Sequence, residues 1–259
     1  MSHRAFVIGA VAIAMSGSAY AKDPLVYSPP EQGSQFYQAT PTWAAHVELG
    51  IGGLVFDDEV YGLLEVAGRA AKPVGSGPWN IELEGYGQSI FDSSNAFSMV
   101  GAYVHAFHRT PQSALGVFGG IATYGAPLFV LGAEGNWYFD RFVLKGQVAY
   151  NAPFDSGSDG FVMLRGGVDY YITANHKIGG YLAFEGGSSF DATEIGLEGE
   201  RRFGNHFSGF GRVAAITAGV AANDTFWRFM LGVRAFSDNG DLRMSDELVP
   251  FAVRFIPYD

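Results

Sequence analysis

The 259-residue sequence contains no cysteine, so neither a disulfide nor a thiol-ligated metal can hold its fold. It is also poor in basic residues, with 16 Lys and Arg against 26 Asp and Glu and a formal net charge of −10. Nucleic-acid binding needs basic patches, so this balance argues against a nucleic-acid partner. Beyond residue 21 there is no apolar run long enough to span a bilayer as a helix.

The first 21 residues have the pattern of a secretory signal peptide. Arg4 supplies a positive charge, residues 5–15 are apolar, and Ala19-Tyr20-Ala21 is an A-x-A cleavage site. Residues 22–41 contain four prolines among polar residues, which predicts an extended N-terminal segment. An exported chain without disulfides is more consistent with one large, well-paired β structure than with a small stapled fold.

From residue 42 to residue 236 the chain alternates with the period of a β-strand. Between Trp79 and Gln88, for example, Ile81 and Leu83 share one face with Trp79, and Glu82 and Glu84 share the other. Such runs predict about twelve strands, within a range of 10–14, and one domain over 42–236. The expected strands are 42–55, 60–71, 79–89, 96–107, 113–123, 128–139, 141–151, 160–173, 176–187, 192–203, 206–217 and 226–236.

Short and long connections alternate between these runs. Asp140, Ala174-Asn175 and Gly204-Asn205 are tight turns, whereas residues 152–159 and 218–225 are longer links. This alternation is typical of a closed antiparallel up-and-down transmembrane β-barrel with short periplasmic turns and longer external loops. Closure would pair the last strand with the first and leave no sheet edge exposed.

Charge separates the two faces of the predicted strands. Apart from Arg201, beside a turn, no acidic or basic residue lies on the more apolar face, which we assign to lipid because a charge there is costly. The other face carries ten acids and eight bases, which we predict to line the lumen: Glu48, Glu65, Arg69, Glu82, Glu84, Glu134, Lys145, Arg165, Asp169, Lys177, Glu185, Glu194, Glu198, Glu200, Arg202, Arg212, Arg228 and Arg234.

All four tryptophans fall on the apolar face near predicted strand ends. Trp43, Trp79 and Trp137 belong to one rim and Trp227 to the other, as in the aromatic girdles of membrane barrels. Soluble sandwiches also place Trp at strand ends, so a soluble secreted β-protein that binds a ligand is an alternative. Twelve strands of similar length would then need two six-stranded sheets with protected edges, which favours the membrane barrel.

The sequence carries no recognisable catalytic, metal or cofactor motif. It has neither a G-x-S-x-G nor an H-E-x-x-H pattern. His46 is expected to pair with Glu48 in the lumen, and His105 and His108 are expected at a solvated turn without a third ligand. We therefore predict no enzyme activity, with an outer-membrane lipid-modifying enzyme as the alternative, and no cofactor.

The charged lumen is the main functional indication. Three acids of one strand, Glu194, Glu198 and Glu200, face basic residues of the next two strands. These are Arg212 on the first and Arg228 and Arg234 on the second, and the arrangement predicts an acid–base ladder. Such pairs could fill the lumen of a structural barrel, or they could line a narrow path for small solutes. Both interpretations stay open at this point.

Two segments resemble small porin-like outer-membrane β-barrels of Gram-negative bacteria, especially alphaproteobacteria. Gly132–Gln147 reads as strand, tight turn and strand, and Trp227–Phe236 is similar to a closing strand that ends in Phe. The resemblance implies the cell outer membrane as location, with outer-membrane lipid and the barrel-assembly machinery as partners, and small solutes if the lumen is open. A porin-like passive channel or a structural barrel, monomeric or trimeric, is the function we predict.

The C-terminus departs from that family pattern. Such barrels commonly end at the closing aromatic residue, whereas this chain continues for 23 residues after Phe236. Residues 237–247 are polar and acidic, and Leu248 to Phe255 alternate weakly around Pro250. Because proline disfavours a central strand, we predict a periplasmic tail over 237–259, with an additional strand as the alternative.

Overall fold

The computed structural model describes residues 43–56, 59–92, 96–154, 159–188, 191–218 and 224–256. The predicted signal peptide (1–21) and the extended N-terminal segment (22–41) lie outside the described residues. Among the described residues, no helix is long and apolar enough to span a membrane.

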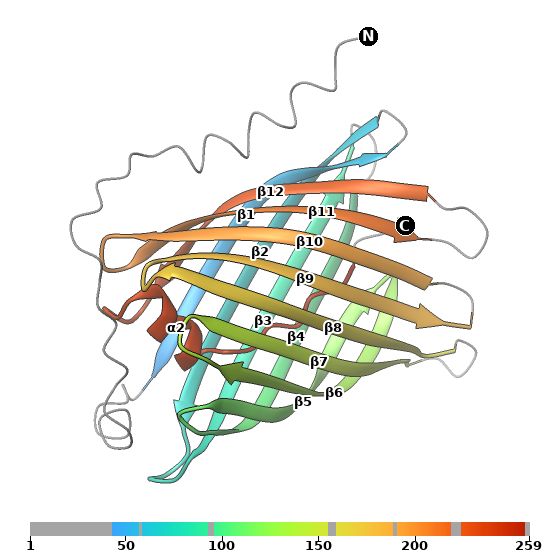
Figure 1. Cartoon of the computed structure of the whole chain (residues 1–259). Helices are drawn as coiled ribbons and strands as arrows, with labels where there is room; N and C mark the ends of the chain where they lie inside the picture. The colour runs from blue at the N-terminus through green and yellow to red at the C-terminus, as the bar shows by residue number, and fades with distance from the viewer. Residues whose placement is uncertain are drawn as a thin grey trace.

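Twelve antiparallel strands form one closed barrel, which confirms the predicted fold (Figure 1). Each strand pairs with its neighbours in sequence, and β12 closes on β1 in a register that sets His46 opposite Phe236 and Val55 opposite Trp227. The strands are β1 (Ala44–Phe56), β2 (Glu59–Pro73), β3 (Trp79–Phe91), β4 (Ala96–Arg109), β5 (Ser113–Tyr124), β6 (Ala126–Tyr138), β7 (Phe142–Pro153), β8 (Phe161–Thr173), β9 (His176–Gly187), β10 (Asp191–Phe203), β11 (Phe207–Ala218) and β12 (Asp224–Phe236).

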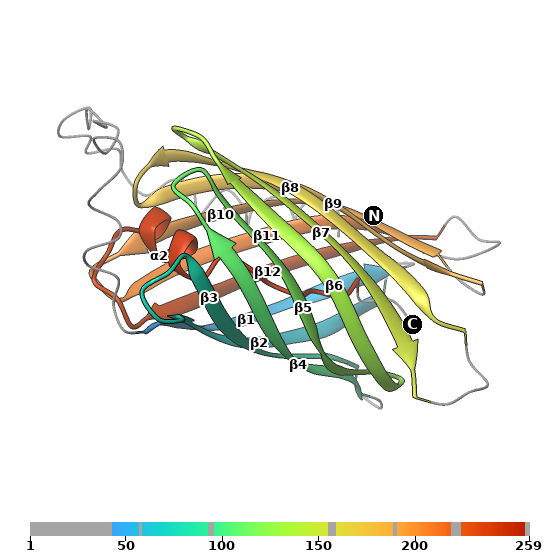
Figure 2. The same cartoon turned by 90° about the horizontal axis from the view of Figure 1, so that it is seen from below.

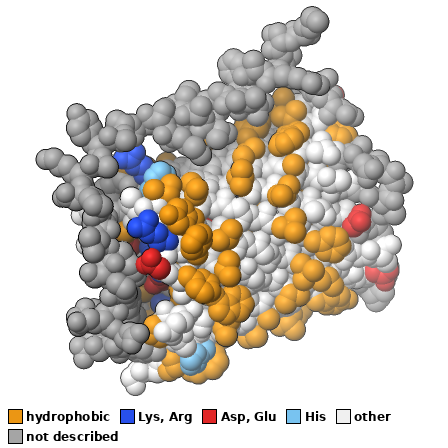
Figure 3. Space-filling model, viewed as in Figure 1, with side chains coloured by type: hydrophobic (Ala, Val, Ile, Leu, Met, Phe, Trp, Pro, Cys, Tyr) orange, Lys and Arg blue, Asp and Glu red, His pale blue; other side chains and the backbone are white. Residues whose placement is uncertain are grey.

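The strands form because their alternating residues meet two different environments. Along β3, Asn80, Glu82 and Glu84 are buried inside the barrel, and Ile81 and Leu83 are exposed on its outer wall. Figure 3 shows hydrophobic side chains spread over this outer wall, with charged side chains near its two ends. The strands hold 12 to 15 residues, more than the nine to eleven that cross a hydrocarbon core.

A glycine makes room for an aromatic ring where β5 pairs with β4. A Cβ added at Gly120 would overlap the carbonyl oxygen of Ala102 and the ring of Tyr103. Gly120 and Tyr103 are register partners, so the ring of Tyr103 occupies the space that a side chain would take. The absence of a side chain at Gly120 thus lets the ring of Tyr103 pack directly against the backbone of β5.

The prediction of a periplasmic tail after Phe236 is wrong for the residues that the structure describes. The chain turns back into the barrel, forms α2 (Leu242–Leu248) at the mouth with the short turns, and continues through the interior without regular structure (Figures 1 and 2). We call residues 242–256 the plug. It is not an extra strand either, because β1 and β12 already pair with each other and leave no edge.

Candidate functional site

The interior of the barrel holds all eighteen charged side chains that the alternation assigned to the lumen. Fourteen of them are buried, and four, Lys145, Arg165, Glu198 and Arg212, are partly exposed to the interior space. An unpaired buried charge is strongly disfavoured, and most of these side chains form ion pairs with one another, with His105 or with residues after β12.

The acid–base ladder across β10, β11 and β12 is present. Arg212 Nε lies 3.4 Å from Glu198, its register partner on β10. Arg234 donates to Glu200 at 2.9 Å, and Arg228 contacts Glu194, which also accepts from the hydroxyl of Tyr181. Two arginines of β12 therefore contact glutamates of β10, although β11 lies between these strands. Long side chains that point inward can bridge this distance because the wall of a barrel curves around its lumen.

A second group of charges joins the ladder to β1 and β2, the strands that follow β12 around the barrel. Glu48 of β1 accepts from Arg212 at 2.8 Å through one oxygen and from Arg234 at 2.9 Å through the other. Glu65 of β2 accepts from Arg212 at 2.8 Å, and Glu84 of β3 accepts from Arg69 at 3.2 Å. Arg212 and Arg234 thus tie the ladder to β1 and β2, and Arg69 ties β2 to β3, so the ion pairs follow six consecutive strands of the barrel.

The helix of the plug is fixed at the mouth by the short turns. The side chain of Asp241 caps α2 by accepting from the amide of Met244 at 2.8 Å. Arg243 donates to the carbonyl oxygens of Phe139 and Asp140, in the turn between β6 and β7. The amide of Leu242 donates to the side-chain oxygen of Asn175, in the turn between β8 and β9, at 3.1 Å.

Acidic side chains of α2 extend the charged network to this mouth. Asp246 accepts from Lys177 at 2.6 Å and from Arg234 at 3.3 Å. Glu247 pairs with Arg243 one turn earlier in the helix, at 2.9 Å. Burial raises the pKa of Glu247 above its ordinary value, and the pairing with Arg243 opposes that shift.

Beyond α2, side chains of the wall satisfy the backbone of the plug. Asn136 donates to the carbonyl of Pro250 at 2.9 Å, and Gln147 donates to that of Ala252 at 3.3 Å. The amide of Val253 donates to Glu84 at 2.8 Å, and the amide of Ile256 donates to Glu185 at 2.8 Å. Polar side chains of the wall, which water would hydrogen-bond in an open lumen, therefore bond to the backbone of the plug instead.

Arg254 is the deepest charge of the plug, and three glutamates surround it. Its three nitrogens each face a different carboxylate: Nη2 lies 3.2 Å from Glu48, Nε 3.4 Å from Glu65, and Nη1 3.2 Å from Glu84. The guanidinium also lies over the ring of Tyr86, 4.8 Å from its centroid, at cation–π distance. The wall thus contacts the whole edge and one face of the guanidinium plane.

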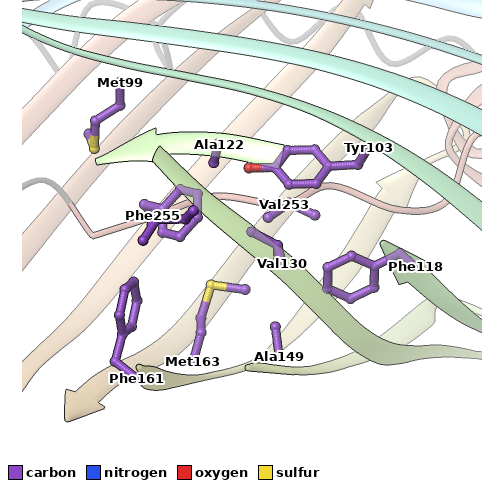
Figure 4. Packing of buried hydrophobic residues seen from close by; sticks show 11 residues of the cluster. Met99, Tyr103, Phe118, Ala122, Val130, Ala149, Phe161, Met163, Val253 and Phe255 are labelled. Carbon is purple, nitrogen blue, oxygen red and sulfur yellow. The ribbon is translucent and has the colours of Figure 1, made fainter. Parts of the chain in front are cut away.

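The apolar side chains beside Arg254 enter a different part of the lumen. Figure 4 shows Phe255 and Val253 among the inward side chains of β4, β5, β6, β7 and β8. Both are buried, and the cluster that they join contains Met99, Tyr103, Phe118, Ala122, Leu128, Val130, Ala149, Phe161 and Met163. The lumen therefore has an acidic wall, formed by Glu48, Glu65 and Glu84, and an apolar wall, formed by the cluster just described. The plug presents Arg254 to the acidic wall and Phe255 to the apolar wall.

The expectation that His105 lies at a solvated turn is wrong. β4 continues to Arg109, so His105 points into the lumen and is fully buried. Its Nδ1 lies 2.7 Å from Glu134 and its Nε2 lies 3.4 Å from Glu84. Its ring stacks between Phe118 and Phe251, so it joins the acidic wall to the plug. No group of three or more potential metal ligands occurs among the described residues.

A cavity remains beside the plug within the lumen. Its volume is about 140 Å³, and its lining includes Lys145, Asp169 and Arg165 of the wall and Arg254 of the plug. A polar cavity of this size holds on the order of ten water molecules. The plug thus fills the barrel only in part.

The four tryptophans lie on the outer wall, where they are about half exposed. Trp79 packs edge-on against His108, and Trp43 lies under the ammonium of Lys72 at 5.3 Å. Arg201 is also exposed on this wall, near the turn after β10. Between the strand ends the outer wall is mainly apolar, with exposed side chains such as Leu197 and Ile51.

Neither a protein-family model nor a curated protein matches the sequence, and the likeness to known proteins is one of structure. The NanC porin has a TM-score of 0.56 at 12% identity, covering 72% of this chain and 98% of that one. A monoaromatic hydrocarbon channel, CymD, has a TM-score of 0.51 at 8% identity over 80% and 91% of the two chains. The KdgM porin has a TM-score of 0.50 at 11% identity over 73% and 98%.

These likenesses establish the fold alone, which is that of outer-membrane porin-like barrels. The plug residues, Arg254 and Phe255 above all, are the part of the site that the sequence patterns missed. One signal was available, because ten acids against eight bases on the inward faces leave an excess of acid for a cation from elsewhere.

Proposed function

We propose that this protein is a porin-like outer-membrane channel for small solutes and that its plug holds the channel closed. The observation that carries the proposal is the way in which the plug is attached. The extended part is bound through side chains of the wall, such as Asn136, Gln147 and Glu84, while the twelve strands complete their pairing without it. If the plug left, all twelve strands would remain paired, and the lumen would fill with water.

The placement in the membrane belongs to the same proposal. The apolar outer wall, the rim tryptophans and the low cost of a charge at the rim, where Arg201 lies, support a place in the outer membrane of a Gram-negative envelope. The alphaproteobacterial type rests only on the resemblance of Gly132–Gln147 and Trp227–Phe236. We propose that the signal peptide over 1–21 directs export and is cleaved, and that the barrel-assembly machinery inserts the chain. The mouth that holds α2 would face the periplasm, because the short turns gather there.

A second candidate function, a structural barrel, rests on the ion-pair network. Glu48, Arg212 and Arg234 tie the neighbouring strands β1, β11 and β12 together through their side chains, and such links could serve to stiffen a barrel that never conducts. The two functions differ in what happens when the plug is loosened.

Planar-bilayer recording separates these candidates. The double variant Arg254→Ala/Phe255→Ala removes the plug side chains that contact the three glutamates and the apolar cluster, and it leaves every strand residue in place. We expect rare brief openings in the wild type and frequent, long openings in the double variant. A double variant that runs as a heat-modifiable band in the outer-membrane fraction, yet passes no current at any salt concentration, would show a structural barrel. Recovery of the wild type in the periplasmic wash would contradict the membrane placement.

A further inference from the structure

We infer that the lumen contains a binding site for a small organic cation that joins a guanidinium to a neighbouring aromatic or branched apolar group. In this structure the plug occupies that site with its own Val253-Arg254-Phe255. The inference rests on the proposed function, because a solute reaches this site only through an opened lumen. It adds the chemical class of the solute and a means by which the solute would displace the plug.

The acidic wall has the geometry of a guanidinium receptor. Glu48, Glu65 and Glu84 come from three adjacent strands and contact three different nitrogens of one guanidinium, at 3.2 to 3.4 Å. A guanidinium holds its N–H donors in one fixed plane, so carboxylates placed around that plane bind arginine better than lysine. An ammonium ion could meet the same carboxylates but would not fill the plane above Tyr86.

The carboxylates are held in place by groups other than Arg254. Arg212 and Arg234 contact Glu48, Arg212 also contacts Glu65, and Arg69 contacts Glu84. These partners all belong to strands, so the receptor persists when the plug leaves. The site is therefore preorganised for a guanidinium from any source.

The apolar wall supplies the second half of the recognition. Phe255 packs against Met99, Phe161 and Met163, and its ring meets that of Phe161 edge-on at a centroid distance of 6.4 Å. Adjacent residues of an extended chain point to opposite sides, so the plug reaches both walls at once. A free ligand needs the same pairing of a flat cation and an apolar group. Binding of such a ligand would compete with docking of the plug.

Titration calorimetry in detergent with the full-length double variant Arg254→Ala/Phe255→Ala tests the site directly. The probe is N-acetyl-Val-Arg-Phe-amide, and its matched control replaces Arg with citrulline, which has the same shape but no charge. We expect the arginine peptide to bind and the citrulline peptide to bind about tenfold to a hundredfold more weakly, because charge-assisted hydrogen bonds are lost. Equal affinities, or no binding of the arginine peptide, would overturn the inference.

A second measurement keeps both native side chains, Arg254 and Phe255. In the single-cysteine variant Val253→Cys, the arginine peptide should raise the rate of thiol labelling and the citrulline peptide should not. An unchanged rate at saturating peptide would also overturn the inference.

The current recorded from the double variant distinguishes failure of this inference from failure of the channel. Current without peptide binding removes the ligand class and leaves the channel. Peptide binding without current leaves the site and removes the channel.

Discussion

Replacement of Phe255 by alanine should release the plug without changing any charge. The ring is 2% exposed and packs among Met99, Phe161 and Met163, so release of the plug transfers it from a closed pocket to water. Truncation of a buried phenylalanine costs about 3–5 kcal/mol, and each 1.4 kcal/mol changes an equilibrium tenfold. The ratio of released to docked plug should therefore rise by about a hundredfold to a few thousandfold.

Thiol labelling measures this ratio because the chain has no native cysteine. Val253→Cys places one thiol at a fully buried position of the plug, where it reacts only when the plug leaves. In this background, Phe255→Ala should raise the labelling rate by the factor above. Phe142→Ala removes the same ring from the exposed outer wall and should leave the rate unchanged. Equal rates for Phe255 and Phe255→Ala would refute the claim that the apolar wall holds the plug.

Three further predictions concern the mouth, the outer wall and the packing of the strands. Arg243→Ala removes the contacts of α2 with the turn after β6, so labelling at the buried plug position should rise by about tenfold; no change would mean that the helix is held elsewhere. Leu197→Arg places a charge in the middle of an outward strand face and should reduce folding stability in lipid by about 2–4 kcal/mol in urea titrations. Arg201→Leu, at the rim, should change that stability little, and equal effects of the two substitutions would contradict the placement in lipid. Gly120→Leu should reduce the heat-modifiable band, because its side chain would overlap the neighbouring strand, whereas Gly85→Leu, which has open space around its Cα, should not; equal bands would contradict the packing.

The strands were predictable because one physical signal decides them. Inside the barrel a charge finds partners, and outside it meets an apolar solvent, so charged residues mark the inward face of each strand. The tight turns at Asp140, Ala174-Asn175 and Gly204-Asn205 then set where the strands end, and each lies between two observed strands.

The apolar wall was hidden from the same reasoning. In β4 the inward residues Met99, Tyr103 and Phe107 are as apolar as the outward Val100 and Val104, so hydrophobicity does not distinguish the faces. Only the pairing of β4 with the charged face of β3 fixes which residues point inward.

The plug was missed because its pattern suits two environments. The alternation from Leu248 to Phe255 fits an edge strand and also fits an extended chain between an acidic and an apolar wall. An edge strand would hydrogen-bond to the backbone of another strand, whereas the backbone of the plug hydrogen-bonds to side chains of the wall. The partners Asn136 and Glu84 lie 114 and 169 residues away in the sequence, so no local pattern predicts them.

A reversible lock on the plug tests the central claim most directly. Val249 of the plug packs against Ala71 of β2, so the pair Ala71→Cys/Val249→Cys can join them in a chain that has no other cysteine. In the Arg254→Ala/Phe255→Ala background, we predict no current from the oxidised protein and restored current after reduction, with each single cysteine variant conducting in both conditions. Current that persists in the oxidised protein would contradict the account, because the lumen would then conduct with the plug in place.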